Sequence, residues 1–265
     1  LLLLVKIHGK RKTLMKINSK CLIAGCSHSA GFEIDGTEDS LSNRSKCFGA
    51  QLSTMLTLVP HNISLGAQSN SAIARSVIDY IEKDTTNSID FVVVGWTEMT
   101  RVDLPSKHDV DHDGSNPAVD TFTTVNKRWL QINSGWEGFT PYEKSIMPYW
   151  HEFMYNKSDI LDLITVKEML MLQLYLNAKG IDYVFCNTML PYVPTRWTEW
   201  YWNLIDNEKC MWDDEGFWFK YRELGYYNKK AKYWHHDETP HRLYAEELYN
   251  SIAERGSKPF SRNLF

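Results

Sequence analysis

The sequence predicts an α/β protein, folded as a three-layer α/β/α sandwich around a mostly parallel sheet. Short apolar runs with the length of buried parallel strands occur at residues 21–25, 90–95 and 181–187. Segments with helical spacing lie between and after these runs, at residues 46–57, 72–83, 141–156, 159–179 and 238–255. Strands that alternate with helices are typical of a parallel sheet covered on both faces, so we expect one α/β domain.

Local signals mark the ends of two of these helices. Ser69 and Asn70 are both residue types that cap helix N-termini, and one of them is expected to cap the helix over 72–83. The segment 159–179 is apolar on nearly all sides and is followed by Gly180. Glycine at that position fits the left-handed residue that follows many helices.

Two segments depart from this domain pattern. Residues 1–14 begin with a five-residue apolar run, which is too short to span a membrane, and basic residues follow it rather than precede it, unlike in a signal peptide. We expect residues 1–14 to be an unstructured upstream extension and residues 15–265 to form a single domain. Residues 101–140 are polar and irregular, and are expected to form an inserted loop of the kind that often covers an active site.

Composition and charge exclude several classes of function. The net charge is −4 with a pI near 6.2, and no basic run is long enough to follow a phosphate backbone, so no nucleic-acid partner is expected. No membrane partner is expected either, and the sequence does not indicate an oligomeric state. The five cysteines are scattered and lack metal-ligand spacing, which favours reduced, buried thiols in a cytoplasmic protein.

The inserted loop contains a run with the spacing of a calcium-binding loop. Asp109–Asp120 has acidic residues at positions one, three, five and twelve and glycine at position six. However, Pro105 lies where a preceding helix would be needed, and Asn116 replaces the apolar anchor at position eight. We interpret the run as a solvated acidic loop and expect no metal.

Aromatic residues make up 13% of the chain and include ten tryptophans. Flat rings stack on the apolar faces of sugars, so the tryptophans indicate a carbohydrate-binding groove, with packing in the core as the alternative. The candidates for such a wall are Trp129, Trp136, Trp150, Trp197, Trp200 and Trp202. Trp96 and Arg101 follow the apolar run at 90–95 and are expected to border the ligand pocket.

The motif Gly-Cys-Ser-His-Ser-Ala-Gly, at residues 25–31, directly follows the first predicted strand. In open α/β sheets ligands bind at the carboxyl ends of the strands, so Ser27 lies where its hydroxyl can meet a substrate. Backbone N–H groups at the start of a following helix are directed at an anion there, which suits acyl transfer. Serine is also a common capping residue in turns, so this motif alone is a weak signal.

Four blocks, taken in order, resemble the SGNH/GDSL hydrolase superfamily. Residues 25–31 resemble its first block, GDS, in the GCS variant of bacterial and phage members. Residues 62–73 (NISLGAQSNSAI) are similar to the second block, and residues 92–101 (VVVGWTEMTR) are similar to the third. Residues 235–248 (HHDETPHRLYAEEL) resemble the last block, which carries a catalytic histidine. The order and spacing of the four blocks are more specific than any single one.

The resemblance implies an α/β/α sandwich with a flavodoxin-like sheet, and ester hydrolysis by a serine nucleophile with a histidine base. Ser27 then corresponds to the nucleophile and His235 to the base. The backbone N–H groups of Ser27 and Gly66 would hold the oxyanion, with Asn70 or Thr97 as a further donor. No cofactor is implied, the substrate would be a small-molecule or carbohydrate ester, and the GCS variant points to a phage or other viral origin.

The sequence departs from the family pattern around these residues. Thr97 stands where the third block of the family has asparagine, and His236 replaces the proline that follows the catalytic histidine. Cys26 replaces the aspartate of the GDS block, which is usual in this variant. Asn70 is a nearby amide that could serve in place of the missing asparagine.

The aspartate that orients the histidine base in the family is also missing. The positions where it is expected hold Lys232 and Tyr233. The far nitrogen of the His235 ring then needs an acceptor from a backbone carbonyl or from another carboxylate, and Asp237 and Glu238 are the nearest in sequence. A Ser-His dyad is the remaining alternative.

Three functions are compatible with the sequence. The first is a serine esterase that acts on an ester such as an O-acetyl group on a carbohydrate. The second is a catalytically degenerate SGNH fold that binds a glycan or a protein, as the missing aspartate and the Thr97 replacement suggest. The third is a nucleotide-binding flavodoxin-like protein, but the 25–31 turn lacks a P-loop lysine and a GxGxxG run.

Overall fold

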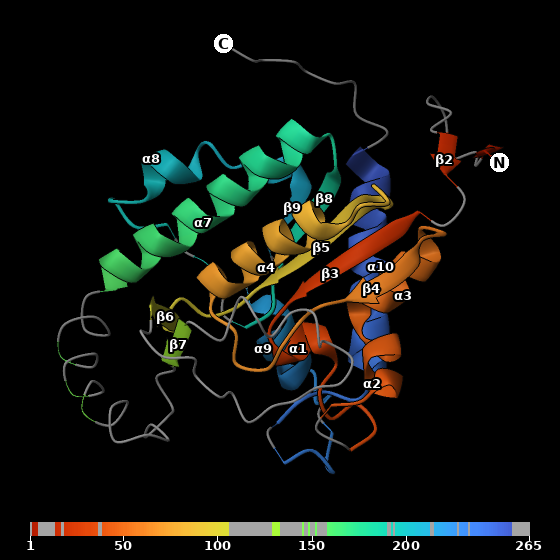
Figure 1. Cartoon of the computed structure of the whole chain (residues 1–265). Coiled ribbons are helices and arrows are strands. Elements are labelled where there is room, and N and C mark those ends of the chain that lie inside the picture. The colour runs from red at the N-terminus through yellow and green to blue at the C-terminus, as the bar shows by residue number, and fades with distance from the viewer. Residues whose placement is uncertain are drawn as a thin grey trace.

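The computed structural model of the chain shows a five-stranded sheet with helices packed against it, and two separate antiparallel pairs of strands (Figure 1). The structure describes residues 2–4, 14–16, 19–36, 39–105, 129–132, 145, 148, 152, 158–189, 192, 194–212, 215–226, 228–232 and 234–255. The five-stranded sheet and its covering helices carry the candidate functional site.

The five-stranded sheet is parallel throughout, in the order β4-β3-β5-β8-β9. Its strands are β3 (Lys20–Gly25), β4 (Val59–Asn62), β5 (Ile89–Trp96), β8 (Asp182–Asn187) and β9 (Cys210–Met211). The three apolar runs predicted as buried strands are β3, β5 and β8, which are the three inner strands. Both faces of these strands are covered, which explains why their sequences are continuous apolar runs rather than alternating patterns.

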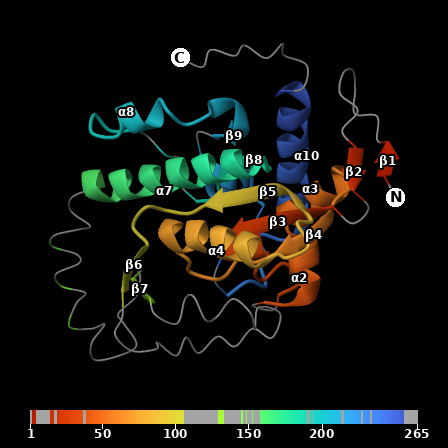
Figure 2. The same cartoon turned by 45° about the horizontal axis from the view of Figure 1, so that its top comes forward.

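Helices on both faces give the molecule three layers (Figures 1 and 2). The long helices are α4 (Asn70–Lys83) and α7 (Ser158–Lys179) on one face, and α3 (Phe48–Met55) and α10 (Glu238–Arg255) on the other. Successive strand residues point to opposite faces, so Leu22 packs with α4 and α7 while Ile23 packs with α3 and α10. The predicted three-layer α/β/α sandwich with a parallel sheet is confirmed.

Two helix boundaries follow the predicted capping signals. The Ser69 side chain caps α4, because it accepts a hydrogen bond of 3.0 Å from the backbone N–H of Ala72. Gly180 follows α7 with a φ of +69°, the left-handed conformation expected of a residue just beyond a helix. Asn70 is the first residue of α4 rather than its cap, which leaves its side chain available for other contacts.

Shorter elements fill the connections. They are α1 (Ser27–Ala30), α2 (Leu41–Lys46), α8 (Glu199–Trp202), the 3-10 helix η3 (Asn207–Lys209) and α9 (Gly216–Glu223). The structure describes all five cysteines, and each is a buried free thiol. In the described part of the chain, no helix is both long and apolar enough to cross a membrane.

The two antiparallel pairs lie in the segments that depart from the domain pattern. β1 (Leu2–Leu4), in the predicted extension 1–14, pairs with β2 (Leu14–Lys16), which lies across the boundary between that extension and the predicted domain. β6 (Val102–Pro105) pairs with β7 (Trp129–Ile132) inside the predicted insert 101–140. The Asp109–Asp120 run and nearly all of the helix predicted over 141–156 lie outside the described residues. The division into an extension and a single domain stays a prediction.

The packing of α7 on the sheet gives a test of the fold. Leu172 is fully buried in the apolar core, whereas Leu174 on the same helix is 59% exposed. Leu172→Ala is expected to lower the free energy of unfolding by about 2–5 kcal/mol, because it leaves a cavity. Leu174→Ala should change it by less than about 0.5 kcal/mol. Urea unfolding followed by circular dichroism measures both values, and equal losses would contradict this packing.

Candidate active site

The candidate site lies at the carboxyl edge of the parallel sheet. Gly25 at the end of β3 is paired with Gly95 in β5. Ser27 and Thr97 each follow two residues later, so the parallel register brings both to the same edge. This is the edge at which open α/β sheets bind their ligands.

Glycine at the strand ends allows the Ser27 turn to lie directly on the sheet. A Cβ added to Gly25 or to Gly95 would overlap the Ser29 hydroxyl, and one on Gly95 would also lie 2.6 Å from a Thr188 side-chain carbon. No side chain fits at either position, so the α1 turn packs against bare backbone. This close approach fixes the position of Ser27 relative to β5 and β8.

Ser27 itself is 9% exposed. Its carbonyl accepts a hydrogen bond of 3.0 Å from the backbone N–H of Phe32, which closes the α1 turn. In the described part of the chain, the Ser27 hydroxyl has no hydrogen-bond partner. The hydroxyl is therefore not used to cap the turn, which was the structural alternative for this residue.

A buried carboxylate from the same turn contacts His235. Glu33 Oε2 lies 2.7 Å from His235 Nδ1, and Glu33 Oε1 accepts a hydrogen bond of 2.6 Å from the backbone N–H of Lys232. Glu33 is 1% exposed and adopts a φ of +61°, an uncommon conformation for a residue other than glycine. With Glu33 ionised, Nδ1 carries the proton and donates, and Nε2 keeps its lone pair.

Glu33 was missed in the sequence analysis, which considered carboxylates near His235 in the sequence. Asp237 and Glu238 are wrong as orienting acids: Asp237 accepts from the backbone N–H of Thr239 at 3.0 Å, and Glu238 pairs with Lys46 at 3.6 Å. Both lie at the start of α10, where carboxylates cap the helix instead. The one local signal for Glu33 is its position between two apolar residues, Phe32 and Ile34, in the turn that follows Ser27.

The pKa of His235 reflects two opposing effects. Burial lowers it below the ordinary value, while the hydrogen bond and negative charge of Glu33 raise it again. The net direction is downward, so the ring is neutral at pH 7 and Nε2 can accept a proton. In the described residues, Nε2 has no hydrogen-bond partner.

The His235 ring lies against the Ser27 turn. Its centroid is 4.7 Å from that of His28, the residue after Ser27, and 5.9 Å from that of Phe32. The two predicted catalytic residues therefore belong to one site. No hydrogen bond joins the Ser27 hydroxyl to the His235 ring in the described part of the chain.

Gly66 is the predicted oxyanion residue that the structure brings nearest to this turn. The backbone N–H of Leu65 donates to the Gly25 carbonyl at 3.2 Å, so the β4–α4 loop follows the end of β3. A Cβ on Gly66 would lie 3.0 Å from the Phe32 ring, which itself faces His235. The backbone N–H of Gly66 forms no hydrogen bond among the described residues.

Asn70 is wrong as an oxyanion donor, because its amide is used within the protein. Its Nδ2 donates to the Thr97 carbonyl at 3.1 Å and to Thr165 Oγ1 at 3.3 Å, and its Oδ1 accepts from the Thr97 backbone N–H at 2.9 Å. Both amide hydrogens are thereby occupied. Asn70 instead bonds both the backbone N–H and the carbonyl of Thr97, which holds the end of β5 in place. The Thr97 hydroxyl is buried and without a partner in the described part of the structure.

Two further histidines near the site, His236 and His241, have structural contacts. His236 Nε2 lies 3.0 Å from the Trp218 carbonyl, and His241 Nδ1 accepts from the backbone N–H of Phe48 at 3.3 Å. Both rings pack against Phe217, with centroids 5.2 and 4.9 Å away. In the ranges that the structure describes, no cluster of three or more His, Cys, Asp or Glu could hold a metal.

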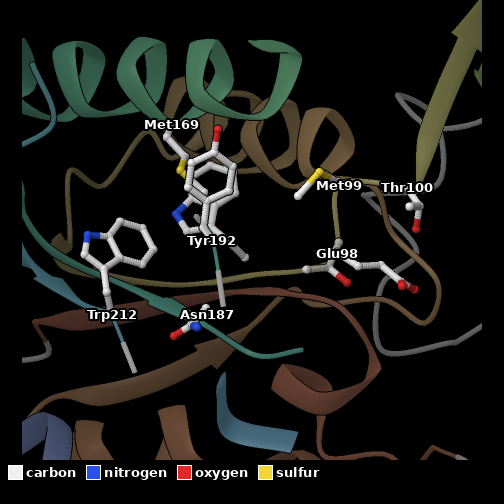
Figure 3. A pocket seen from close by; sticks show the side chains of 9 residues that line it. Glu98, Met99, Thr100, Met169, Asn187, Tyr192 and Trp212 are labelled. Carbon is white, nitrogen blue, oxygen red and sulfur yellow. The ribbon is translucent and has the colours of Figure 1, made fainter. Parts of the chain in front are cut away.

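A small pocket of about 130 Å³ lies at the ends of β5 and β8, on the same edge of the sheet as the Ser27 turn. Trp96 and Thr97 line it, together with Glu98, Tyr192 and Trp212, whereas Arg101, which was predicted with Trp96 to border the ligand pocket, does not line it. Figure 3 shows Trp212 at one end of the pocket and Glu98 at the other. Ser27 and His235 do not line this pocket, so it neighbours the candidate catalytic groups rather than enclosing them.

The predicted tryptophan wall is only partly formed. Trp197 and Trp200 are 56% and 66% exposed, whereas Trp202 packs on the core and stacks on Tyr192 with centroids 4.7 Å apart. The other candidates, Trp129, Trp136 and Trp150, have side chains that lie outside the described residues. A sugar-stacking role is therefore supported only by the exposed pair.

No protein-family model and no curated protein matches this sequence. Several solved structures are similar to it. One is a carbohydrate esterase family 2 enzyme with a carbohydrate-binding domain from Corynascus thermopiles (Myceliophthora fergusii), at 14% identity, covering 90% of this chain and 67% of that one, with a TM-score of 0.47.

Two further solved structures are similar over nearly their whole length. The psychrotrophic esterase EstA from Pseudoalteromonas sp. is 12% identical over 91% of this chain and 100% of its own, with a TM-score of 0.42. A carbohydrate acetylesterase family member from Sinorhizobium meliloti is 12% identical over 90% and 100%, with a TM-score of 0.43. At these identities and TM-scores the likeness assigns no activity to this chain, whose own residues carry the functional case.

The contact between Glu33 and His235 can be tested by titration. Glu33→Gln removes the negative charge that raises the pKa of His235, so that pKa should fall further below its ordinary value. Asp237→Asn and Glu238→Gln should leave it unchanged, because neither carboxylate contacts the ring. NMR titration of the histidine ring signals measures all three variants. A shift in either control as large as that in Glu33→Gln would contradict the assignment.

The buried histidines also predict how stability depends on pH. Burial is the main cause that lowers the pKa of His28, His235, His236 and His241 in the folded state. Below about pH 6.5 the unfolded chain then binds more protons than the folded one, so the free energy of unfolding should fall as the pH falls from 7 to 5. Burial also lowers the pKa of His61, and the raised pKa of Asp162, about 6, opposes these histidines as one group against five.

Urea unfolding at several pH values measures the slope of this dependence. Each histidine contributes at most about 1.4 kcal/mol per pH unit. His28→Asn removes one of these histidines. It should therefore reduce the slope of the free energy of unfolding against pH by at most about 1.4 kcal/mol per pH unit. A free energy of unfolding that stays constant between pH 7 and 5 would be incompatible with neutral, buried imidazoles.

Proposed function

We propose that this protein is a serine ester hydrolase in which Ser27 is the nucleophile, His235 the general base and Glu33 the orienting acid. The observation that carries the proposal is the buried Glu33–His235 pair, which lies against the turn that presents Ser27. Serine, histidine and carboxylate are recognised as a catalytic set by their roles and geometry rather than by their positions in the sequence. Here the acid comes from the nucleophile's own turn.

The proposed reaction uses two groups that have no hydrogen-bond partner in the described part of the site, the Ser27 hydroxyl and His235 Nε2. The Ser27 hydroxyl attacks the acyl carbon while its proton passes to His235 Nε2, which the Glu33 contact leaves unprotonated. The tetrahedral intermediate then expels the alcohol, which takes the proton from Nε2. Water, deprotonated by the same nitrogen, attacks the acyl-enzyme and releases the carboxylic acid and Ser27.

The negative oxygen of the intermediate needs hydrogen-bond donors in place before the reaction. The backbone N–H groups of Ser27 and Gly66 are suited to this, since neither is used in the described part of the fold. The Thr97 hydroxyl is a further donor if the end of β5 shifts when substrate binds. Asn70 supports this arrangement indirectly, by holding the Thr97 backbone.

The missing hydrogen bond between Ser27 and His235 is compatible with this mechanism. Catalytic hydrogen bonds are often long without substrate and tighten only in the reactive complex. Both side chains are almost fully buried and lack other partners at the reacting atoms, so a small rotation of the serine hydroxyl has no competing contact to break. A neutral imidazole beside a free hydroxyl is the state that proton abstraction requires.

For the substrate we propose a small-molecule or carbohydrate ester. The exposed rings of Trp197 and Trp200 offer flat apolar faces of the kind that stack on sugars. The pocket beside the site is small and lined largely by aromatic and methionine side chains, including Tyr192, Trp212 and Met169. It suits a short apolar part of such a substrate.

Ser27→Ala should abolish hydrolysis of p-nitrophenyl acetate and labelling by a fluorophosphonate probe, because only an activated serine reacts with the probe. Ser29→Ala is the matched control, since Ser29 lies on the same turn but is fully buried. The control should keep both activity and labelling. Spectrophotometric assay and intact-protein mass spectrometry give the two readouts.

Two outcomes would count against the nucleophile. Equal activity in the wild-type protein and in Ser27→Ala would show that another group performs the hydrolysis. Absence of labelling and of turnover in the wild-type protein, with the fold intact by circular dichroism, would favour the alternative function, a degenerate fold that binds a glycan or protein without turnover.

A further inference from the structure

Arg101 is a buried cation with an unused edge. Its side chain is 10% exposed, and its Nε donates a hydrogen bond of 2.9 Å to Glu98 Oε1. Its Nη1 is fully buried and has no hydrogen-bond partner in the described part of the chain, and Nη2 forms no hydrogen bond there either. The guanidinium is therefore held through one edge, while the edge formed by Nη1 and Nη2 is free.

A buried charged donor without a partner is destabilising, so it points to a group that is present only in the functional state. The free edge of a guanidinium presents two parallel N–H groups. This geometry matches the two oxygens of a carboxylate, which it can bind in a bidentate manner. Glu98 cannot fill this role, since it is already bonded to the Nε side.

Arg101 also lies next to the candidate site. Glu98, its partner, lines the pocket at the ends of β5 and β8, at the end opposite Trp212, although Arg101 is not itself a lining residue (Figure 3). Burial is the largest cause that lowers the pKa of His28 and of His235. The positive charge of Arg101 is a smaller cause that lowers both. The cation therefore acts electrostatically on the imidazoles at the reacting centre.

We propose that Arg101 binds a carboxylate group of the substrate, so that the esterase acts preferentially on anionic esters. The inference rests on the proposed ester hydrolysis and adds its substrate class. The carboxylate would lie on Nη1 and Nη2, with Glu98 holding the guanidinium in plane from the other side. Arg101 is then a specificity residue, separate from the groups that break the ester bond.

Matched pairs of esters test this preference. p-Nitrophenyl hydrogen succinate and p-nitrophenyl butyrate differ by a carboxylate or a methyl group on the acyl side. 4-Acetoxybenzoate and 4-acetoxybenzamide differ by a charge on the alcohol side. We expect kcat/KM of the wild-type protein to favour the anion in at least one pair by about 10- to 100-fold, the range of a charge-assisted hydrogen bond.

Variants then connect the preference to Arg101. Arg101→Gln should lose the preference, and so should the double variant Glu98→Gln/Arg101→Gln, which avoids leaving Glu98 unpaired. Arg101→Lys should keep part of it, because the charge remains without the bidentate edge. Arg242→Gln is the control: it also removes one arginine charge, from an exposed ion pair with Glu246 on α10, and should keep the full preference.

Several results would overturn the proposal. The first is that the wild-type protein prefers the anion in neither ester pair. The second is a preference that remains in both Gln variants. The third is an equal loss of activity toward neutral and anionic esters in Arg101→Gln. Labelling of Ser27 by the neutral fluorophosphonate reports the proposed hydrolysis separately. If the wild-type protein does not label, the carboxylate-binding role of Arg101 is tested separately from hydrolysis. The melting temperature is then measured with sodium succinate and with succinamide. Stabilisation by succinate in wild type but not in Arg101→Gln supports it, and equal effects refute it.

Discussion

The buried carboxylate of Glu33 is the constraint on which the candidate site depends. It joins the turn after β3 to a loop 202 residues further along the chain, through the His235 ring and the Lys232 backbone. A buried carboxylate is costly unless it is hydrogen-bonded, so these contacts stabilise each other: the loop satisfies Glu33, and Glu33 fixes the loop. Since Ser27 begins the same turn, one short segment positions both the nucleophile and the acid of the proposed mechanism.

The sheet supports this turn through close packing. Gly25 and Gly95 leave room for Ser29 between the strands and the turn, so the segment that carries Ser27 rests on rigid backbone. At the end of the neighbouring strand β5, the backbone of Thr97 is held by Asn70 of α4. The amide Nδ2 and Oδ1 of Asn70 bond the Thr97 carbonyl and N–H. Sites built on such rigid elements hold reacting groups more accurately than sites on free loops.

Burial and charge together set the protonation states that the proposed chemistry needs. Burial keeps His235 neutral, as a general base at pH 7 must be, while Glu33 prevents its pKa from falling further. Two carboxylates have separate tasks here. Glu33 contacts an imidazole, whereas Glu98 holds the Arg101 guanidinium through its Nε side and leaves Nη1 buried without a partner in the described part of the chain.

The sequence by itself determined the three-layer fold and the inner strands, because apolar runs and helical periodicity are local patterns that burial imposes on each element. It also indicated Ser27 and His235, since a strand-end turn and an ordered set of motifs are visible along the chain. Only the tertiary structure decided that Glu33 is the carboxylate in contact with His235, that the Asn70 amide holds the Thr97 backbone and that Asp237 caps a helix. Hydrogen-bond partners far apart in the sequence are chosen by folding, and proximity along the chain does not reveal which donors and acceptors are already satisfied.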